Sequence, residues 1–126
     1  MIIVSTNRNV HPSKVGHEIF GNSFSGLGNR FAIAKFIESE AEYVDWDEDE
    51  ELHEPEDSWA IDLTDAGAET ELFESLVTKI NNGDTELSRP WVCFLHGNNQ
   101  SFEKNLKKCR RLEILYNVNV FVFSCP

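Results

Sequence analysis

Residues 91–123 constrain the fold more than any other part of the chain. Residues 91–95 form a continuous apolar run, Trp-Val-Cys-Phe-Leu, which is typical of a strand buried on both faces at the centre of a sheet. Residues 101–116 have helical periodicity, and residues 118–123 form another β-rich apolar run. A strand, a helix and a strand in this order predict a parallel strand pair with a right-handed crossover.

The central helix of this unit is predicted to be amphipathic. Its apolar side chains share one face that packs on the sheet, namely Phe102, Leu106, Cys109, Leu112 and Tyr116. The opposite face is basic and carries Lys104, Lys107, Lys108, Arg110 and Arg111. We expect this basic face to be solvated or to pair with the protein's own acidic residues.

Shorter patterns predict three more strands and a second helix. Strands are expected at residues 2–5, 31–37 and 59–63, where β-branched and aromatic residues cluster. Apolar residues recur at helical spacing from Leu72 to Ile80, with Asp65 as the expected cap and Gly83 as the expected end. The glycine-rich stretch between His11 and Asn29 predicts an irregular loop.

Together these elements predict an α/β fold in one domain that spans residues 1–126. The sheet is expected to be small and mixed but largely parallel, with about five strands and two main helices. A hydrophobic fraction of 40% and an aromatic content of 11% indicate a folded core. No stretch approaches the ~20 apolar residues of a membrane span, so we expect a cytoplasmic protein.

The chain is strongly acidic, with a formal net charge of -11. This balance disfavours nucleic acid and anionic membranes as partners, because phosphate binding needs a surplus of Lys and Arg. A basic or neutral protein partner fits better. Over half of the acids lie in residues 38–57. Within this stretch we predict an acidic interaction surface, formed by Asp45, Trp46, Asp47, Asp49 and Glu51.

Metal and cofactor sites are not expected. Alternating acids in residues 45–51 resemble calcium ligands, but an EF-hand loop needs a central glycine, and none occurs between Phe31 and Ala66. Three histidines, at His11, His17 and His53, also suggest a metal site without a recognised ligand spacing. A solvated acidic loop is the favoured interpretation.

The three cysteines lack a C-x-x-C pair and indicate neither a disulfide framework nor a zinc site. Cys93 lies within an apolar strand and Cys109 on an apolar helical face, so both are expected to be small buried hydrophobes. Cys125 is expected to be more accessible, either as a reactive or intermolecular thiol or, as we favour, as a simple substitution.

One segment carries a family resemblance. Phe94-Leu95-His96-Gly97-Asn98-Asn99, then Ser101-Phe102-Glu103 and later residues 121–124, resemble the strand, oxyanion loop, helix and next strand of α/β-hydrolases. The likeness is greatest to an uncharacterised bacterial subgroup of predicted serine hydrolases, which often opens with a Thr-Asn-Arg-Asn element like residues 6–9. Cys125 departs from this pattern, since the subgroup usually has Trp there.

The resemblance implies an N-terminal half-domain that stops before the nucleophile. The family's nucleophile lies on a Gly-x-Ser-x-Gly elbow after the next helix and strand, and this chain contains no such motif. The resemblance therefore implies an oxyanion-loop remnant without catalysis, formed by His96, Gly97, Asn98 and Asn99. His96 is expected to be a turn residue rather than an acid-base group.

The same resemblance implies an open sheet edge. In the family, the strand before the oxyanion loop lies between the strand that follows it in sequence and the nucleophile strand. Here the nucleophile strand is missing, so the apolar strand becomes an edge that seeks another strand. We therefore predict a homodimer that pairs through Trp91, Val92, Cys93, Phe94 and Leu95.

Three functional hypotheses follow from the sequence. The favoured one is a non-catalytic hydrolase-like half-domain that acts as a binding or interaction protein. The second is a serine-hydrolase-type esterase whose nucleophile is Ser23, Ser25 or a residue of a partner chain. The third is the relic of a broken hydrolase gene. Activity on short-chain esters, abolished by a serine-directed phosphonate, separates the second from the others.

Overall fold

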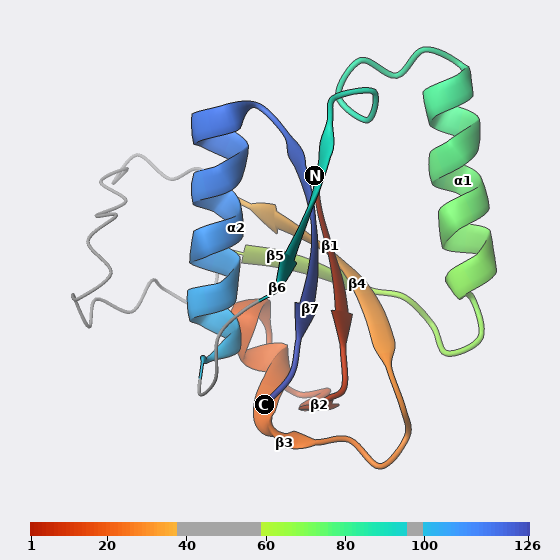
Figure 1. The fold of residues 1–126 in the computed structure, drawn as a ribbon. Coiled ribbons are helices and arrows are strands. Elements are labelled where there is room, and N and C mark those ends of the chain that lie inside the picture. The colour runs from red at the N-terminus through yellow and green to blue at the C-terminus, as the bar shows by residue number, and fades with distance from the viewer. Residues whose placement is uncertain (38–58, 96–99) are drawn as a thin grey trace.

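A computed structural model describes residues 1–37, 59–95 and 100–126. The described elements, in chain order, are β1 Ile2–Thr6, β2 Arg8–Val10, the 3-10 helix η1 Gly16–Ile19, β3 Phe20–Phe24, β4 Arg30–Phe36, β5 Trp59–Leu63, α1 Glu69–Asn81, β6 Trp91–Leu95, α2 Phe102–Tyr116 and β7 Asn119–Ser124. Strands β5-β4-β1-β7-β6 form one sheet in that order, and β2 pairs with β3 in a separate hairpin. Helices α1 and α2 lie on opposite sides of the sheet (Figure 1).

The predicted mixed sheet of five strands with two helices is confirmed, but its description as largely parallel is wrong. Strand β7 runs parallel to both β1 and β6, whereas β4 runs antiparallel to both β1 and β5. The hairpin of β2 and β3 is antiparallel as well. The reason lies in the connections: β6 and β7 are joined through α2, whereas no long helix separates β1 from β4, and antiparallel neighbours need no helical crossover.

Both helices form where the apolar periodicity predicts them. Helix α2 begins after Ser101, whose Oγ accepts a hydrogen bond from the Lys104 backbone N–H at 3.2 Å, and it ends at Asn117 in the left-handed conformation. Helix α1 is followed by Gly83, which has a φ of 86°. The predicted cap at Asp65 is wrong, because the helix begins after Ala68 without a side-chain cap.

The expectation of an irregular loop between His11 and Asn29 is wrong in part. This stretch contains η1 and β3, and β3 pairs with β2. The hairpin is anchored by Phe20, whose ring meets the Phe102 ring edge-on at 4.9 Å between centroids. Short strands with polar residues between glycines give no clear alternation, so the sequence carries little signal for them.

The main core lies between the sheet and α2. Every residue of β1 is buried. The buried members of this core are Ile2, Val4, Phe20, Ala32, Ala34, Trp59, Phe102, Leu106, Cys109, Val118, Val120 and Val122. The last turn of α2 does not join them, since Tyr116, which the sequence places on the packed face, is 67% exposed.

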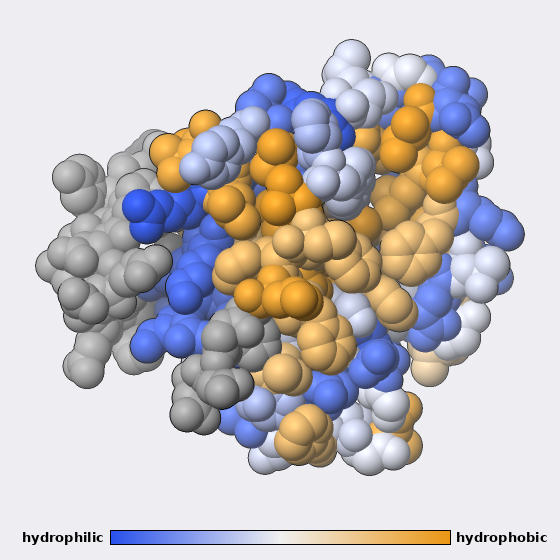
Figure 2. Space-filling model, viewed as in Figure 1, coloured by the Kyte–Doolittle hydropathy of each residue, from blue (hydrophilic) through white to orange (hydrophobic). Residues whose placement is uncertain are grey.

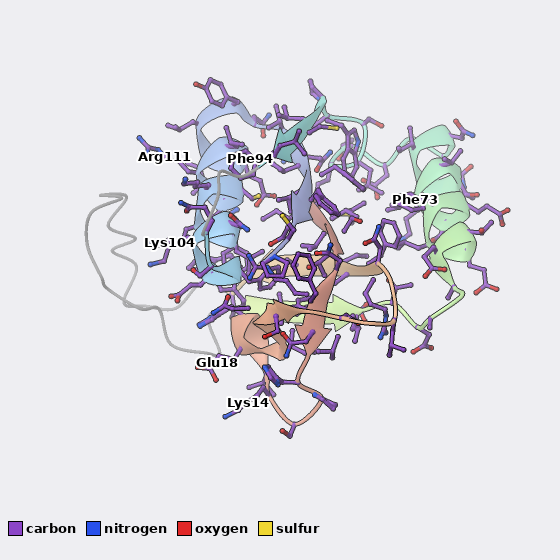
Figure 3. All side chains as sticks on the ribbon, turned by 60° about the horizontal axis from the view of Figure 1, so that its bottom comes forward. Lys14, Glu18, Phe73, Phe94, Lys104 and Arg111 are labelled. Atoms are coloured by element: carbon purple, nitrogen blue, oxygen red, sulfur yellow. The ribbon has the colours of Figure 1, made fainter. Side chains whose placement is uncertain are left out.

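The opposite side of the sheet has a much smaller core. Its buried members are Ile3, Leu76 and Leu87. Helix α1 covers this side, and its Phe73 points toward the sheet (Figure 3), where its ring meets that of Phe31 at 5.4 Å between centroids. Phe73 nevertheless stays 36% exposed and Val77 56% exposed. Helix α1 therefore leaves apolar surface uncovered on its side of the sheet.

None of the described helices is both long enough and apolar enough to cross a bilayer.

Candidate interaction surface along strand β6

Two of the three predicted sites lie outside the residues that the structure describes. These are the oxyanion-loop remnant at residues 96–99 and the acidic interaction surface at residues 45–51. The third, the predicted dimer edge, is fully described and coincides with β6. The geometry of β6 therefore carries the functional argument.

Strand β6 is the outermost strand on its side of the sheet, with β7 as its neighbour. The Asn119 N–H donates to the Pro90 carbonyl at 2.9 Å, so the backbone of Pro90 points toward β7. Backbone groups alternate in direction along a strand, so Val92 and Phe94 also point toward β7. The N–H and C=O groups of Trp91, Cys93 and Leu95 consequently point outward, where no described strand pairs with them.

Side chains of β6 on the α1 side of the sheet are exposed. These are Trp91 at 36%, Leu95 at 77% and Cys93. Trp91 is held from one side, because its indole N–H donates to the Leu87 carbonyl at 3.0 Å. The expectation of a central strand buried on both faces is therefore wrong. An apolar run indicates that the side chains of a strand favour burial. It does not show whether the fold supplies the neighbouring elements that bury them.

Side chains of β6 on the α2 side are better covered. Val92 and Phe94 are half-buried and pack against the main core, together with Leu112. No side chain of β6 carries a charge. Natural sheet edges usually carry charged residues or proline, which discourage pairing with another chain. Strand β6 lacks such a residue within its bounds.

The exposed side chains of β6 continue into a larger apolar surface. Cys93 lies beside Phe121 and Leu95 beside Phe123 in the register with β7. The Phe121 ring lies 6.5 Å from that of Phe73 on α1, measured between centroids. Figure 2 shows hydrophobic side chains gathered over the sheet between the two helices. Contiguous exposed apolar surface of this kind marks contact sites more often than isolated exposed residues do.

A buried arginine at the carboxyl ends of β1 and β7 was not identified as important from the sequence. Arg8 is 0% exposed, and its guanidinium donates to the Ser124 hydroxyl at 2.9 Å, the Asn22 side chain at 2.9 Å and the Gly21 carbonyl at 3.1 Å. Further bonds reach the carbonyls of Gln100 and Cys125. Arg8 thus ties the hairpin to the ends of β7 and of the segment before α2.

Burial lowers the pKa of Arg8 from its usual value, and the charge of Cys125 opposes this shift. The five guanidinium bonds all end on neutral oxygens. All five N–H groups of the guanidinium therefore have acceptors within the protein. Arg8 stabilises the fold and has no N–H group left to bind a ligand. The Thr-Asn-Arg-Asn element was the available signal, but the sequence does not show that its arginine turns inward.

The histidines considered as metal ligands do not converge. His11 Nε2 lies 3.3 Å from the Asn9 amide nitrogen, whereas His17 Nε2 lies 3.7 Å from a carboxylate oxygen of Glu103. Among the residues that the structure describes, no group of three or more His, Cys, Asp or Glu side chains is placed to hold a metal ion. His53 lies outside the described residues.

The serines considered as nucleophiles lie on or beside the hairpin. Ser23 donates its backbone N–H to the Asn9 side chain at 3.0 Å, and the Ser25 hydroxyl accepts the Leu27 N–H at 3.1 Å. Neither hydroxyl contacts a histidine or a carboxylate within the described parts of the chain. The first contact links the two sides of the hairpin and the second is local to a turn, and neither activates a serine nucleophile.

The basic face of α2 is partly engaged within its own helix. Lys107 Nζ lies 3.9 Å from Glu103, and an Arg110 guanidinium nitrogen lies 3.6 Å from Glu113. The Arg110 guanidinium also lies over the Phe36 ring, 5.6 Å from its centroid. Lys104 and Arg111 point away from the sheet (Figure 3). The face therefore combines contacts within the protein with side chains that extend away from the sheet.

The cysteines occupy different environments. Cys109 is 0% exposed, as predicted, and burial, assisted by the nearby Glu113, raises its thiol pKa to about 12. The prediction that Cys93 is buried is wrong, because it lies exposed on the edge strand. Cys125 is of intermediate exposure. Cys93 is thus the accessible thiol of the β6 edge.

Comparison with known proteins finds no match for this chain among family models, curated proteins or solved structures.

Proposed function

We propose that this protein is a non-catalytic, α/β-hydrolase-like interaction module that forms a homodimer through strand β6. The observation that carries the proposal is the combination of outward backbone groups with exposed, uncharged side chains on an outermost strand. A basic or neutral protein is the partner class that suits its remaining acidic surface, given a net charge of -11.

Pairing of two β6 strands would form backbone hydrogen bonds and would bury exposed apolar side chains. Backbone N–H and C=O groups exchange water for cross-strand hydrogen bonds, each with a net contribution of about 0.5–1.5 kcal/mol. Burial of an exposed apolar side chain such as Leu95, at 77% exposure, adds about 1.5–3 kcal/mol per copy. The contact is symmetric, so each contribution occurs twice.

The absence of catalysis in this proposal rests on the sequence and on the placed serines. The chain has no Gly-x-Ser-x-Gly motif, and the side-chain hydrogen bonds found at Ser23 and Ser25 within the described residues join them to Asn9 and Leu27 and not to a general base. In this proposal the resemblance to α/β-hydrolases is limited to the arrangement of β6, α2 and β7. A hydrolytic reaction is not part of it.

Sedimentation equilibrium at micromolar concentration tests the proposal. We expect a mass near twice 14.4 kDa for the unmodified chain. Leu95→Lys places a charge in the contact and should weaken association by roughly a hundredfold, about 3 kcal/mol.

Leu27→Lys is the matched control. Leu27 is also exposed, at 90%, but lies in the turn between β3 and β4, away from β6. This variant should dimerise as the unmodified chain does. A monomeric mass for the unmodified protein, or equal losses in the two variants, contradicts the proposal.

A further inference from the structure

We propose that the two β6 strands pair antiparallel about a twofold axis that lies midway between the two copies of Cys93. Trp91 of each copy then lies opposite Leu95 of the other. This inference rests on the proposed dimer and specifies its register. It follows from the directions of the backbone groups, the sides on which the side chains lie and the length of the strand.

The symmetry restricts which residues can oppose each other. A twofold axis perpendicular to the sheet makes the paired strands antiparallel and keeps the two α1 helices on the same side. Directly opposed residues in such a pair point to the same side of the sheet. Trp91, Cys93 and Leu95 lie on the α1 side, and Val92 and Phe94 lie on the α2 side. Residues of the first set can therefore oppose only each other.

The length of β6 then determines at which residue of the strand the twofold axis lies. With the axis at Cys93, every outward-pointing residue finds an outward-pointing partner: Cys93 opposes itself, and Trp91 opposes the partner subunit's Leu95. An axis at Val92 instead moves Leu95 opposite Arg89, whose N–H already donates to the Glu86 carbonyl. An axis at Phe94 moves Trp91 beyond the end of the partner strand. The Cys93 centre therefore forms the most cross-strand hydrogen bonds.

The same register gives complementary side-chain pairs. Trp91 is half-exposed at 36% and Leu95 is largely exposed at 77%, so a wide and a narrow side chain face each other on the α1 side. On the α2 side, Val92 opposes the partner subunit's Phe94. Aromatic residues opposite aliphatic or β-branched ones are favourable cross-strand pairs. No pair sets one charge against another, because the strand has none.

The position of Cys93 makes the register measurable. In a hydrogen-bonded antiparallel pair, directly opposed Cα atoms are about 5.5 Å apart, which is short enough for two thiols to be joined by a small reagent. Residue 91 or 95 and its own copy lie four positions apart along the paired strands, a separation of about 14 Å. Alkylation by a short bis-maleimide therefore distinguishes these positions.

The experiment uses the full chain with Cys125→Ser, in which Cys93 is the accessible thiol and Cys109 stays buried. Adding Cys93→Ser gives the background for Trp91→Cys and Leu95→Cys. We expect the bis-maleimide to cross-link Cys93 at least roughly tenfold faster than either single replacement. A mixture of Trp91→Cys and Leu95→Cys chains should cross-link to each other at a rate comparable with that of Cys93.

Sedimentation of the same samples keeps the two proposals distinct. A dimer in which Leu95→Cys or Trp91→Cys joins its own copy faster than Cys93 does overturns the register and leaves the dimer intact. A dimer with no cross-linking along β6, and no response to Leu95→Lys, places the contact elsewhere and overturns both proposals. Monomeric Cys125→Ser chains, with the unmodified chain also monomeric, overturn the dimer itself.

Discussion

The two outermost strands of the sheet have similar sequences and opposite surroundings. Strand β5 reads Trp-Ala-Ile-Asp-Leu and β6 reads Trp-Val-Cys-Phe-Leu, so each begins with Trp and ends with Leu. In β5 the tryptophan turns toward the main core and is 2% exposed, whereas Trp91 of β6 lies on the other side at 36% exposure. The helix η1 also packs against β5.

The two edge strands differ in the side chains that they expose to solvent. The exposed residues of β5 are Ala60 and the charged Asp62, whereas those of β6 are Trp91, Cys93 and Leu95. A charge on an edge strand opposes pairing with another chain, and its absence permits pairing. In the proposed dimer the two edges of one sheet therefore have different roles: β5 ends the sheet, and β6 pairs with a second copy.

Truncation of the two tryptophans gives the largest expected difference between the edges. Trp59→Ala removes a buried ring that meets Phe36 at 5.3 Å between centroids, and it should lower the free energy of unfolding by about 3–5 kcal/mol. Trp91→Ala should lower the unfolding free energy of the monomer by only about 1 kcal/mol, while weakening dimerisation.

Urea unfolding at protein concentrations below the dimer dissociation constant measures both values without a contribution from association. Sedimentation of the same variants measures the dimer. If Trp91→Ala destabilises the monomer as much as Trp59→Ala does, the comparison between a closed and an open edge fails, because Trp91 then belongs to the core.

The buried thiol of Cys109 links the stability of the core to pH. Burial raises the Cys109 pKa to about 12 in the folded protein, against 9.0 for a freely solvated thiol. Above pH 9 the unfolded chain loses the Cys109 proton before the folded chain does. The stabilisation is therefore complete below pH 9 and is lost as the pH rises toward 12.

At pH 10 this thiol should reduce the free energy of unfolding by about 1.4 kcal/mol relative to pH 8. Cys109→Ala should remove that part of the pH dependence, and Cys93→Ser should leave it in place. Urea unfolding of the three proteins at both pH values supplies the test. Parallel behaviour of the unmodified chain and Cys109→Ala would disprove the assignment.

A change of similar size is expected when the charge on the exposed side of β5 is removed. Asp62→Val should open a second apolar edge and allow dimers to associate further, with a gain of about 1.4 kcal/mol, or tenfold in affinity. Asp62→Asn keeps a polar side chain of similar size and serves as the control. Sedimentation velocity should show species larger than the dimer for the first variant only. Equal behaviour of the two variants would mean that Asp62 does not protect the edge.

Local patterns in the sequence were sufficient to predict the helices and the strands of the main sheet. Helical spacing located α1 and α2, and Ser101 and Asn117 bound α2 through contacts within a few residues in sequence. The three-residue strand β2 and the polar β3 gave no such pattern and were missed. Of the candidate site, the sequence identified the residues of β6 but assigned them two incompatible environments, a sheet centre from composition and an edge from the resemblance.

What the sequence determined by itself is therefore the set of elements and the apolar character of each, because these depend on neighbours within a few positions along the chain. The tertiary structure decided the antiparallel course of β4, the inward turn of Arg8 and the exposure of Cys93. Each of these depends on residues distant in sequence: Arg8 meets Ser124, and among the described strands β6 pairs with β7 alone. An apolar strand has the same kind of sequence at the centre of a sheet as at its edge. The order of the strands in the sheet decides whether its side chains become part of the core or part of an exposed surface.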